Sequence, residues 1–174
     1  MSKIDYDLTK IRAFVFDVDG VLSPSTITMN AHGEPVRMAN VKDGFALALA
    51  VKQCYEIAIV TGSYSPTIEA RFKSLGIKDI FTKTNSKLPV LTKWMQENGL
   101  QRNEVVYVGD DVPDLQCMRA VGLSVAPSDA SDDILAIARY ISPIAGGYGV
   151  ARDVIEQVLK VQGKWIFEEE TLAW

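Results

Sequence analysis

Two acidic residues, Asp17 and Asp19, directly follow the apolar run from Ile11 to Phe16. Such a run is typical of a buried strand, and Gly20 behind the acids lets the backbone turn sharply. Carboxylates at the carboxyl end of such a strand lie where open α/β sheets keep their active sites. Because the two acids repel each other and have no cation nearby in the sequence, they require a metal ion, a shifted pKa, or both.

Three more groups of polar residues suggest what this chemistry is. Thr61-Gly62-Ser63 and Gly109-Asp110-Asp111 each follow a short apolar run, and Lys87 begins a helical pattern. The carboxyl ends of parallel strands share one edge of a sheet, so these groups are expected to converge with the first two acids. Carboxylates that hold Mg²⁺, a hydroxyl and amides for phosphate oxygens, and a lysine for developing charge together suit phosphoryl transfer.

Each group has an ordinary alternative explanation when it is taken alone. An Asp-X-Asp pair is common in surface loops, Thr61-Gly62 is an ordinary turn, and Lys87 reads as a solvated helix residue. Asp110 and Asp111 are also suited to capping a helix N-terminus. The order and placement of all four groups make these explanations together improbable, and the set predicts an active site.

Length and composition indicate one water-soluble domain. The chain has 174 residues, of which 48% are hydrophobic and 23% charged, and its net charge is −4. It is long enough to bury a core without disulfides or structural zinc. No long basic run is present, which argues against nucleic acid or a membrane surface as partner. No apolar run approaches the roughly 20 residues of a membrane span, and the start of the chain lacks a signal-peptide pattern, so a cytoplasmic location is expected.

The cysteines and the histidine carry no prediction of chemistry. Cys54 and Cys117 both lie in apolar segments and are expected to be buried thiols rather than a disulfide or metal pair. His32 stands beside Gly33 in a predicted turn, where a surface position is favoured over a catalytic role.

Strand and helix patterns alternate along the chain, which predicts a parallel sheet covered by helices on both faces, a three-layer doubly wound α/β fold. The expected strands are 11–16, 56–60, 79–81, 105–108, 123–126 and 140–141, and the expected helices are 43–53, 66–75, 86–98, 112–121, 131–138 and 149–162. Residues 26–29 and 35–39 are predicted to be the arms of a β-hairpin.

The four groups match, in order, the signature motifs of the haloacid-dehalogenase-like phosphatases. The chain further resembles the phosphatases of 3-deoxy-D-manno-octulosonate 8-phosphate from about residue 10 to 164. This second likeness rests on Gly33-Glu34, on 40–45 (Asn-Val-Lys-Asp-Gly-Phe), on Ser86-Lys87-Leu88, and on the segments 106–111, 122–126, 144–147 and 162–164.

The resemblance implies a role for each site residue. Asp17 is the nucleophile that forms an aspartyl-phosphate, and Asp19 is the general acid/base, which also binds Mg²⁺ through its backbone carbonyl. Asp17 and Asp110 are the carboxylate ligands of the metal. The phosphate is held by Thr61, Gly62 and Lys87, and Lys87 is also expected to pair with Asp17. Asp111 and Asp114 either orient waters or Lys87 around the site, or serve as helix N-terminal carboxylates.

The resemblance also implies a domain plan and partners. Residues 1–164 form a single phosphatase domain in which the hairpin insertion, residues 25–41, replaces a cap domain. In the resembling subfamily this hairpin joins a homotetramer whose neighbouring subunit helps to close the site, and the same is expected here. The tail, residues 165–174, is expected either to cover a neighbour's site as a lid or to be disordered or packed locally. The expected substrate is a phosphorylated sugar acid of lipopolysaccharide precursor synthesis.

Two departures from the subfamily pattern bear on the substrate. Ser63 and Tyr148 stand where arginines are common, and those arginines would suit the sugar acid's carboxylate. Arg71, Arg152, Lys83 and Lys42 are possible replacements. A phosphatase of nine-carbon 2-keto-3-deoxy sugar acid 9-phosphates is the nearest alternative.

Two other classes of protein remain open from the residues. A phospho-receiver domain uses similar residues on a parallel sheet, but in the order acidic pair, phosphorylated Asp, Thr, Lys, which differs from the order here. A catalytically dead regulatory module usually lacks the nucleophile, whereas Asp17 and Asp19 are both present.

Overall fold

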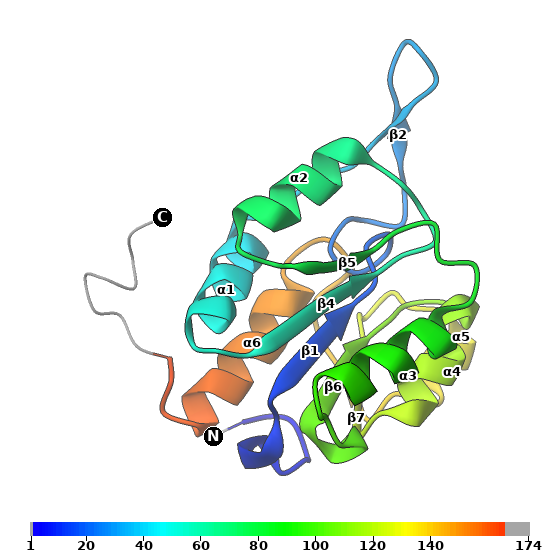
Figure 1. The fold of residues 1–174 in the computed structure, drawn as a ribbon. Coiled ribbons are helices and arrows are strands. Elements are labelled where there is room, and N and C mark those ends of the chain that lie inside the picture. Colours follow the sequence, from blue (N-terminus) through cyan, green and yellow to red (C-terminus); the bar gives the residue numbers. More distant parts are fainter. Residues whose placement is uncertain (1, 166–174) are drawn as a thin grey trace.

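A sheet of six parallel strands forms the centre of the molecule (Figure 1). The computed structural model describes residues 2–165, so residues 166–174 of the predicted tail lie outside the described chain. The spatial order of the strands is β5-β4-β1-β6-β7-β8. Their bounds are Ala13–Phe16 (β1), Glu56–Val60 (β4), Asp79–Phe81 (β5), Val105–Val108 (β6), Leu123–Ala126 (β7) and Tyr140–Ile141 (β8). The chain builds outward from β1 to β5 and then returns to β6 on the other side of β1. The strand order therefore reverses beside β1, which is where doubly wound sheets form their ligand crevice.

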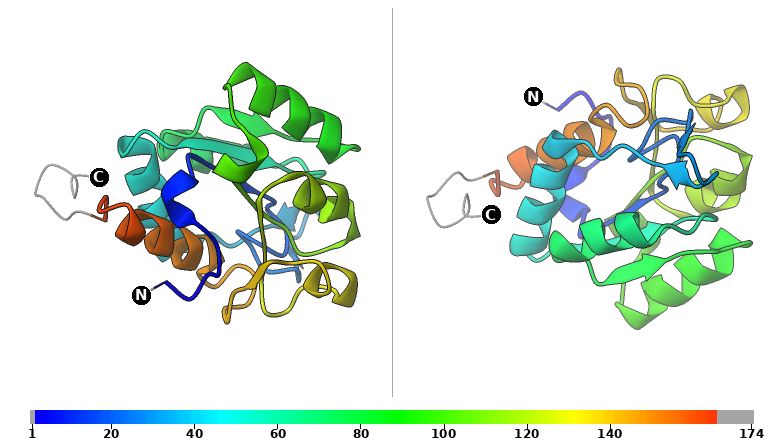
Figure 2. Two further views of the ribbon diagram at one scale, coloured as in Figure 1. Left: turned by 90° about the horizontal axis from the view of Figure 1, so that it is seen from below. Right: turned by 90° about the horizontal axis from the view of Figure 1, so that it is seen from above.

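Helices cover both faces of this sheet, which confirms the predicted three-layer α/β fold (Figure 2). Alternate residues of a strand face opposite sides, so Phe14 and Phe16 belong to one core and Ala13 and Val15 to the other. The first core lies against α1 (Val41–Lys52), α2 (Pro66–Ser74) and α6 (Val150–Val161). The second lies against α3 (Lys87–Glu97), α4 (Leu115–Ala120) and α5 (Asp132–Leu135).

The predicted hairpin is present but short. Its strands are β2 (Thr28–Met29) and β3 (Pro35–Val36), which pair antiparallel and project from the body of the molecule (Figure 1). The Asn30 side chain accepts hydrogen bonds from the backbone amides of His32 and Glu34 and so closes the turn. His32 is exposed, as predicted. The arms are shorter than the predicted 26–29 and 35–39 because each strand has only the other to pair with.

Other elements depart from the sequence prediction in detail. Three short 3₁₀ helices, Leu8–Lys10, Arg102–Glu104 and Val112–Asp114, complete the fold, and the last replaces the first turn of the predicted helix 112–121. The prediction that both cysteines are buried is wrong for Cys54. That residue is exposed because it lies in the turn between α1 and β4, where its backbone adopts a φ of 61°. Cys117 is buried, and both thiols are free. Between residues 2 and 165, no helix combines the length and apolar character needed to span a membrane.

Candidate active site

The residues predicted to do chemistry meet in one crevice at the carboxyl edge of the sheet. Asp17 and Asp19 follow β1, Thr61 follows β4, Asp110 follows β6, and Lys87 is the first residue of α3. All five line the same opening, together with the backbone around Gly62 and the side chains of Ser25, Ser63, Thr84, Asn85 and Asp111. The structure thus brings together residues as far apart in the sequence as Asp17 and Asp111.

Lys87 lies at the centre of a buried ionic network. Its Nζ is 2.8 Å from Asp17 Oδ2 and 2.8 Å from Asp114 Oδ1. Asp114 is fully buried and also accepts hydrogen bonds from the Tyr107 hydroxyl, at 2.7 Å, and from the Asp110 amide, at 3.2 Å. With these partners occupied, Asp114 fixes the lysine beside Asp17. Sequence reasoning left the role of Asp114 open and placed Tyr107 only in a strand.

Two glycines, Gly20 and Gly109, allow Asp110 and Asp114 to lie close to the neighbouring backbone. A Cβ on Gly20, whose φ is +84°, would lie 1.9 Å from Asp110 Oδ2, and a Cβ on Gly109 would lie 2.4 Å from Asp114 Cβ. Only glycine allows these backbone segments to approach so closely. As a result, carboxylate oxygens of Asp17, Asp110 and Asp114 lie within 4.8 Å of one another.

This concentration of carboxylates fits a divalent cation. Burial raises the pKa of Asp17 to about 7, and repulsion from Asp114 adds to the rise although Lys87 opposes it. Burial, followed by the charges of Asp17 and Asp114, likewise raises the pKa of Asp110 to about 7. Burial alone would lower the pKa of Lys87, but Asp17 and Asp114 raise it overall. One lysine therefore leaves the acids short of positive charge, and hard oxygen donors of this kind suit Mg²⁺.

The loop after β4 supplies a second polar wall of the crevice. Thr61 is buried, and its Oγ1 accepts a hydrogen bond from the Ser63 amide at 3.2 Å and lies 2.9 Å from Ser63 Oγ. The loop is anchored to the next segment because the Thr84 amide donates to the Thr61 carbonyl. Hydroxyls and amides arranged in this way can bind the oxygens of a phosphate group.

Asp19 faces a different cation, which sequence reasoning missed. Arg37 donates from Nε to Asp19 Oδ1 at 2.6 Å and from Nη2 to Oδ2 at 2.9 Å, and the Ser63 hydroxyl donates to Oδ2 at 2.8 Å. The guanidinium side chain is only 4% exposed, and its hydrogen bonds to Asp19 raise the pKa of Arg37. The only signal in the sequence was a basic residue within the second arm of the predicted hairpin.

Asp111 contributes less to the crevice than its neighbours. Its carboxylate accepts a hydrogen bond from the Val112 amide at 2.8 Å and so caps the 3₁₀ helix that follows. This is the capping alternative that the sequence left open, whereas Asp114 contacts Lys87.

The cations considered as replacements for the missing arginines lie elsewhere. None of Arg71, Arg152, Lys83 and Lys42 is among the described residues that line the crevice. Arg152 stacks on Phe45 and Trp165, and Lys83 lies over the Tyr64 ring.

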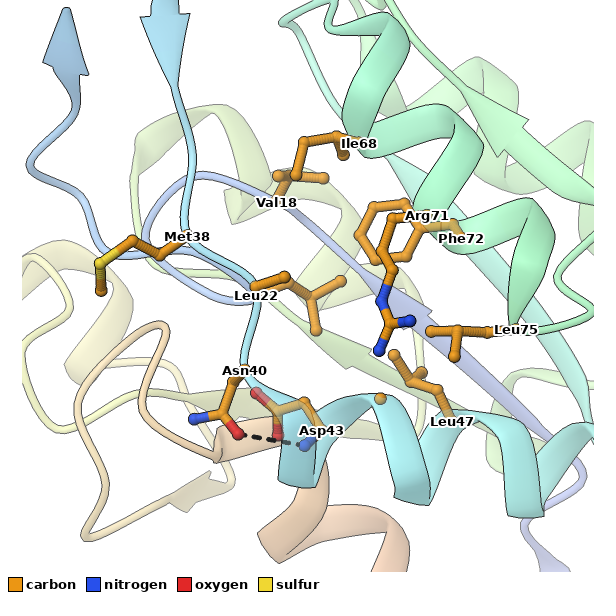
Figure 3. Close-up of a pocket in the computed structure, with 12 residues that line it drawn as sticks. Val18, Leu22, Met38, Asn40, Asp43, Leu47, Ile68, Arg71, Phe72 and Leu75 are labelled. Carbon is orange, nitrogen blue, oxygen red and sulfur yellow. Dashed lines mark hydrogen bonds between the residues drawn. The ribbon is translucent and has the colours of Figure 1, made fainter. Parts of the chain in front are cut away.

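Arg71 lines a separate, mainly apolar pocket between α1 and α2 (Figure 3). There Asp43 accepts a hydrogen bond from the Arg152 amide at 2.7 Å through Oδ1, while its Oδ2 is buried without a hydrogen-bond partner among the described residues.

Comparison with known proteins agrees with this geometry. Residues 37–127 match the model of the family "Haloacid dehalogenase-like hydrolase". The chain belongs to the haloacid dehalogenase-like hydrolases. It is 38% identical over 154 residues to 3-deoxy-D-manno-octulosonate 8-phosphate phosphatase KdsC of Escherichia coli strain K12, an alignment that covers 88% of this chain and 82% of the relative.

Solved structures of related proteins have the same fold. The 3-deoxy-D-manno-octulosonate 8-phosphate phosphatase of Yersinia pestis aligns with a TM-score of 0.87 and 35% identity, over 90% of this chain and 85% of that one. The phosphatase of the same name from Moraxella catarrhalis, solved with magnesium, phosphate and a KDO molecule, aligns with a TM-score of 0.86 and 32% identity, over 91% of both chains. Within the haloacid dehalogenase-like hydrolases, the chain thus belongs to the family that contains these phosphatases.

Proposed function

We propose that this haloacid dehalogenase-like hydrolase is a Mg²⁺-dependent phosphomonoesterase that converts 3-deoxy-D-manno-octulosonate 8-phosphate to the free sugar acid and phosphate. The observation that carries the proposal is the position of Asp17, whose carboxylate lies at the end of β1 with Lys87 on one side and Asp110 nearby. The relatives named above are named as phosphatases of this substrate, which supports the proposal. A role of the product in lipopolysaccharide precursor synthesis is part of the proposal.

The residues of the crevice divide the reaction into two steps. The Asp17 carboxylate forms a bond to phosphorus while the bond from phosphorus to the sugar oxygen breaks, and Asp19 gives its proton to that oxygen. Water then attacks the aspartyl-phosphate, its proton passes to Asp19, and phosphate leaves Asp17. Thr61, Gly62 and Lys87 hold the phosphate oxygens throughout and balance their charge.

Asp17, Asp110 and the backbone carbonyl of Asp19 are proposed to hold the Mg²⁺. When bound, the ion screens the negative charge of the incoming phosphate and stabilises charge in the transition state. Asp114 is not proposed as a ligand because its oxygens already accept hydrogen bonds from Lys87, Tyr107 and the Asp110 amide.

Phosphate release tests the proposal. The wild-type protein is expected to release phosphate from the eight-carbon sugar acid phosphate only with Mg²⁺, and Asp17→Asn is expected to release none while it keeps the same fold by circular dichroism. A non-catalytic regulatory module would release no phosphate in either form, and full activity in Asp17→Asn would contradict the mechanism.

A nine-carbon 2-keto-3-deoxy sugar acid 9-phosphate is the second candidate substrate. Ser63 replaces the arginine common in the eight-carbon enzymes, and its hydroxyl is already bound to Asp19. Tyr148, at the other departure, is 61% exposed. A comparison of kcat/KM for the two substrates distinguishes them, and a hundredfold preference for a simple hexose phosphate, about 2.7 kcal/mol, would contradict both.

We further propose that the protein forms a homotetramer through its hairpin. Four apolar residues on the hairpin, on the segment that follows it and at the first position of α1 are half or more exposed: Met29, Val36, Met38 and Val41. Such a group of apolar side chains is typical of a protein interface. Analytical ultracentrifugation is expected to give a tetramer, and a fully active monomer would contradict the proposal.

A further inference from the structure

The carboxylate of Asp19, the acid/base candidate, lines an open crevice and yet is fixed by several hydrogen bonds. Three hydrogen bonds of 2.6–2.9 Å occupy both carboxylate oxygens, two from Arg37 and one from Ser63. Ser63 is in turn 2.9 Å from the Thr61 hydroxyl. Asp19 is therefore tied to the proposed phosphate loop on one side and to the base of the hairpin on the other.

Arg37 reaches Asp19 at a cost to the stability of the fold. Its side chain lines a small cavity beneath α2, beside Val18, Ile59 and Phe72. Its Nη1 is buried and has no hydrogen-bond partner among residues 2–165. A buried donor left without a partner destabilises a fold, whereas an arginine that extends from a hairpin into water carries no such cost. Features that weaken a fold and lie in a functional site are often retained for the site's chemistry.

The geometry of this contact fits the control of orientation. A guanidinium that donates two parallel hydrogen bonds fixes the plane of a carboxylate, which a single lysine contact does not. A proton donor must also lie within hydrogen-bond reach of the atom that it serves. The Arg37–Ser63 pair holds the Asp19 carboxylate on the Thr61–Ser63 side of the crevice, whereas Asp17 is bound to Lys87.

We propose that Arg37 is a positioning residue for the reaction: with Ser63 it orients the Asp19 carboxyl toward the leaving oxygen of the bound phosphate ester. This inference rests on the proposed phosphatase function and on Asp19 as its acid/base. It also gives the hairpin a role within its own subunit, because Arg37 directly follows β3. Through Arg37, the position of the hairpin affects the orientation of the acid that transfers the proton.

Two classes of substrate separate orientation from a general structural role. A sugar phosphate has a poor leaving group that needs a proton, whereas 4-nitrophenyl phosphate has a good one that does not. Arg37→Gln is expected to lower kcat on the sugar acid phosphate by about tenfold or more and on 4-nitrophenyl phosphate by less than about threefold, because well-placed acid catalysis contributes 10²–10⁴-fold. KM is expected to change little for either substrate.

Three further variants complete the experiment. Arg37→Lys keeps the charge without the paired geometry and is expected to lose less activity, with the same dependence on leaving group. Ser63→Ala removes one of three hydrogen bonds and is expected to show a smaller effect of the same kind. Arg12→Gln is the matched control, because Arg12 is 56% exposed and pairs with Glu104 away from the crevice. It is expected to leave both activities unchanged.

Several outcomes would overturn the inference. Equal losses of kcat on both substrates in all three site variants would do so, as would unchanged kinetics. A rise in KM for the sugar acid phosphate alone, with kcat unchanged, would make Arg37 a substrate-binding residue and would also overturn it. If Arg37→Gln does not fold, as judged by circular dichroism, the leaving-group dependence of Arg37→Lys and Ser63→Ala decides. Wild-type protein that hydrolyses neither ester would refute the proposed function itself, an outcome distinct from all the others.

Discussion

Asp17 and Asp19 are only two positions apart, yet in the fold each acid faces its own cation. Lys87, at the start of α3, is 2.8 Å from Asp17, and Arg37, after β3, is 2.6 Å from Asp19. Each carboxylate is therefore paired with its own cation rather than with the other acid. This division allows one acid to serve as nucleophile while the other transfers protons.

Gly20 provides a test of the proposed metal site at the scale of one residue. In Gly20→Ala the new methyl group would overlap Asp110 Oδ2, so Mg²⁺ affinity measured by calorimetry is expected to fall by at least about tenfold, the lower end for disturbed metal surroundings. Gly33→Ala is the matched control, since Gly33 also has a positive φ, +75°, but has no atom within 4 Å of a new Cβ. It is expected to lose about 1–2 kcal/mol of stability and no Mg²⁺ affinity. Equal affinities in the two variants would contradict the metal site.

Tyr107 tests whether the Asp114–Lys87 contact matters for turnover. Tyr107→Phe removes a buried hydrogen bond to Asp114 and is expected to cost about 1–3 kcal/mol in urea unfolding and to lower kcat. Tyr55→Phe removes a hydrogen bond of 2.6 Å from a buried tyrosine to Gln162, far from the crevice, and is expected to leave kcat unchanged. A normal kcat in Tyr107→Phe would show that Asp114 positions Lys87 without help from the phenol.

Two helix N-termini meet at Asp43, which makes stability depend on pH at the scale of elements. Asp43 lies in the first turn of α1 and accepts from the Arg152 amide in the first turn of α6. Burial raises the pKa of Asp43 to about 6, although the Arg152 amide opposes the rise. The folded state thus binds the proton more tightly than the unfolded chain, whose value is near 3.8. The contribution to stability is complete below that value and is lost as pH rises through about 6.

Asp43→Asn is expected to remove this pH dependence. The free energy of unfolding of the variant relative to wild type should move in the variant's favour by about 2–3 kcal/mol between pH 4 and neutral pH, since one pKa unit is worth about 1.4 kcal/mol. Denaturant titrations at several pH values measure the difference. Asn98→Ala, an uncharged change at the end of α3, provides the control whose difference from wild type stays constant. A constant difference for Asp43→Asn as well would contradict the prediction.

Local sequence patterns were enough to predict the positions of most helices and strands. They were not enough where tertiary contacts determine the burial of a residue or the length of a strand. Strands β4 to β8 lie where the sequence predicted them. The inner strands β1, β6 and β7 are buried along their whole length, and therefore they read as largely apolar runs. Cys54 was assigned to the core because apolar residues surround it, but the turn after α1 exposes it. The hairpin arms kept only two residues each, since no third strand extends their pairing.

At the scale of the whole molecule, topology explains why the acids were predictable and Arg37 was not. A parallel sheet brings all its carboxyl ends to one edge, so residues just after β1, β4 and β6 converge whatever the details of packing. The Arg37–Asp19 contact instead depends on the path of an inserted hairpin and on a cavity beneath α2, which no local pattern records. The contact of Tyr107 with Asp114 was not predictable for a related reason. Both faces of β6 are buried, so the sequence does not indicate which face of the strand points toward Asp114.

The concentration of acids at the carboxyl edge predicts how the stability of the whole molecule responds to Mg²⁺. Because the pKa values of Asp17 and Asp110 are both raised to about 7, protons compete with the metal below that pH. A ligand that binds the folded state stabilises it by RT ln(1 + c/Kd), where c is the free ligand concentration, so at one ligand concentration tighter binding raises the melting temperature more. Saturating Mg²⁺ is therefore expected to raise the melting temperature more at about one pH unit above 7 than one unit below it. Asp110→Asn should show little rise at either pH, whereas Asp111→Asn, which changes the acid that caps the 3₁₀ helix, should respond as wild type does. An equal rise at both pH values in the wild-type protein would mean that Mg²⁺ does not bind at these two carboxylates.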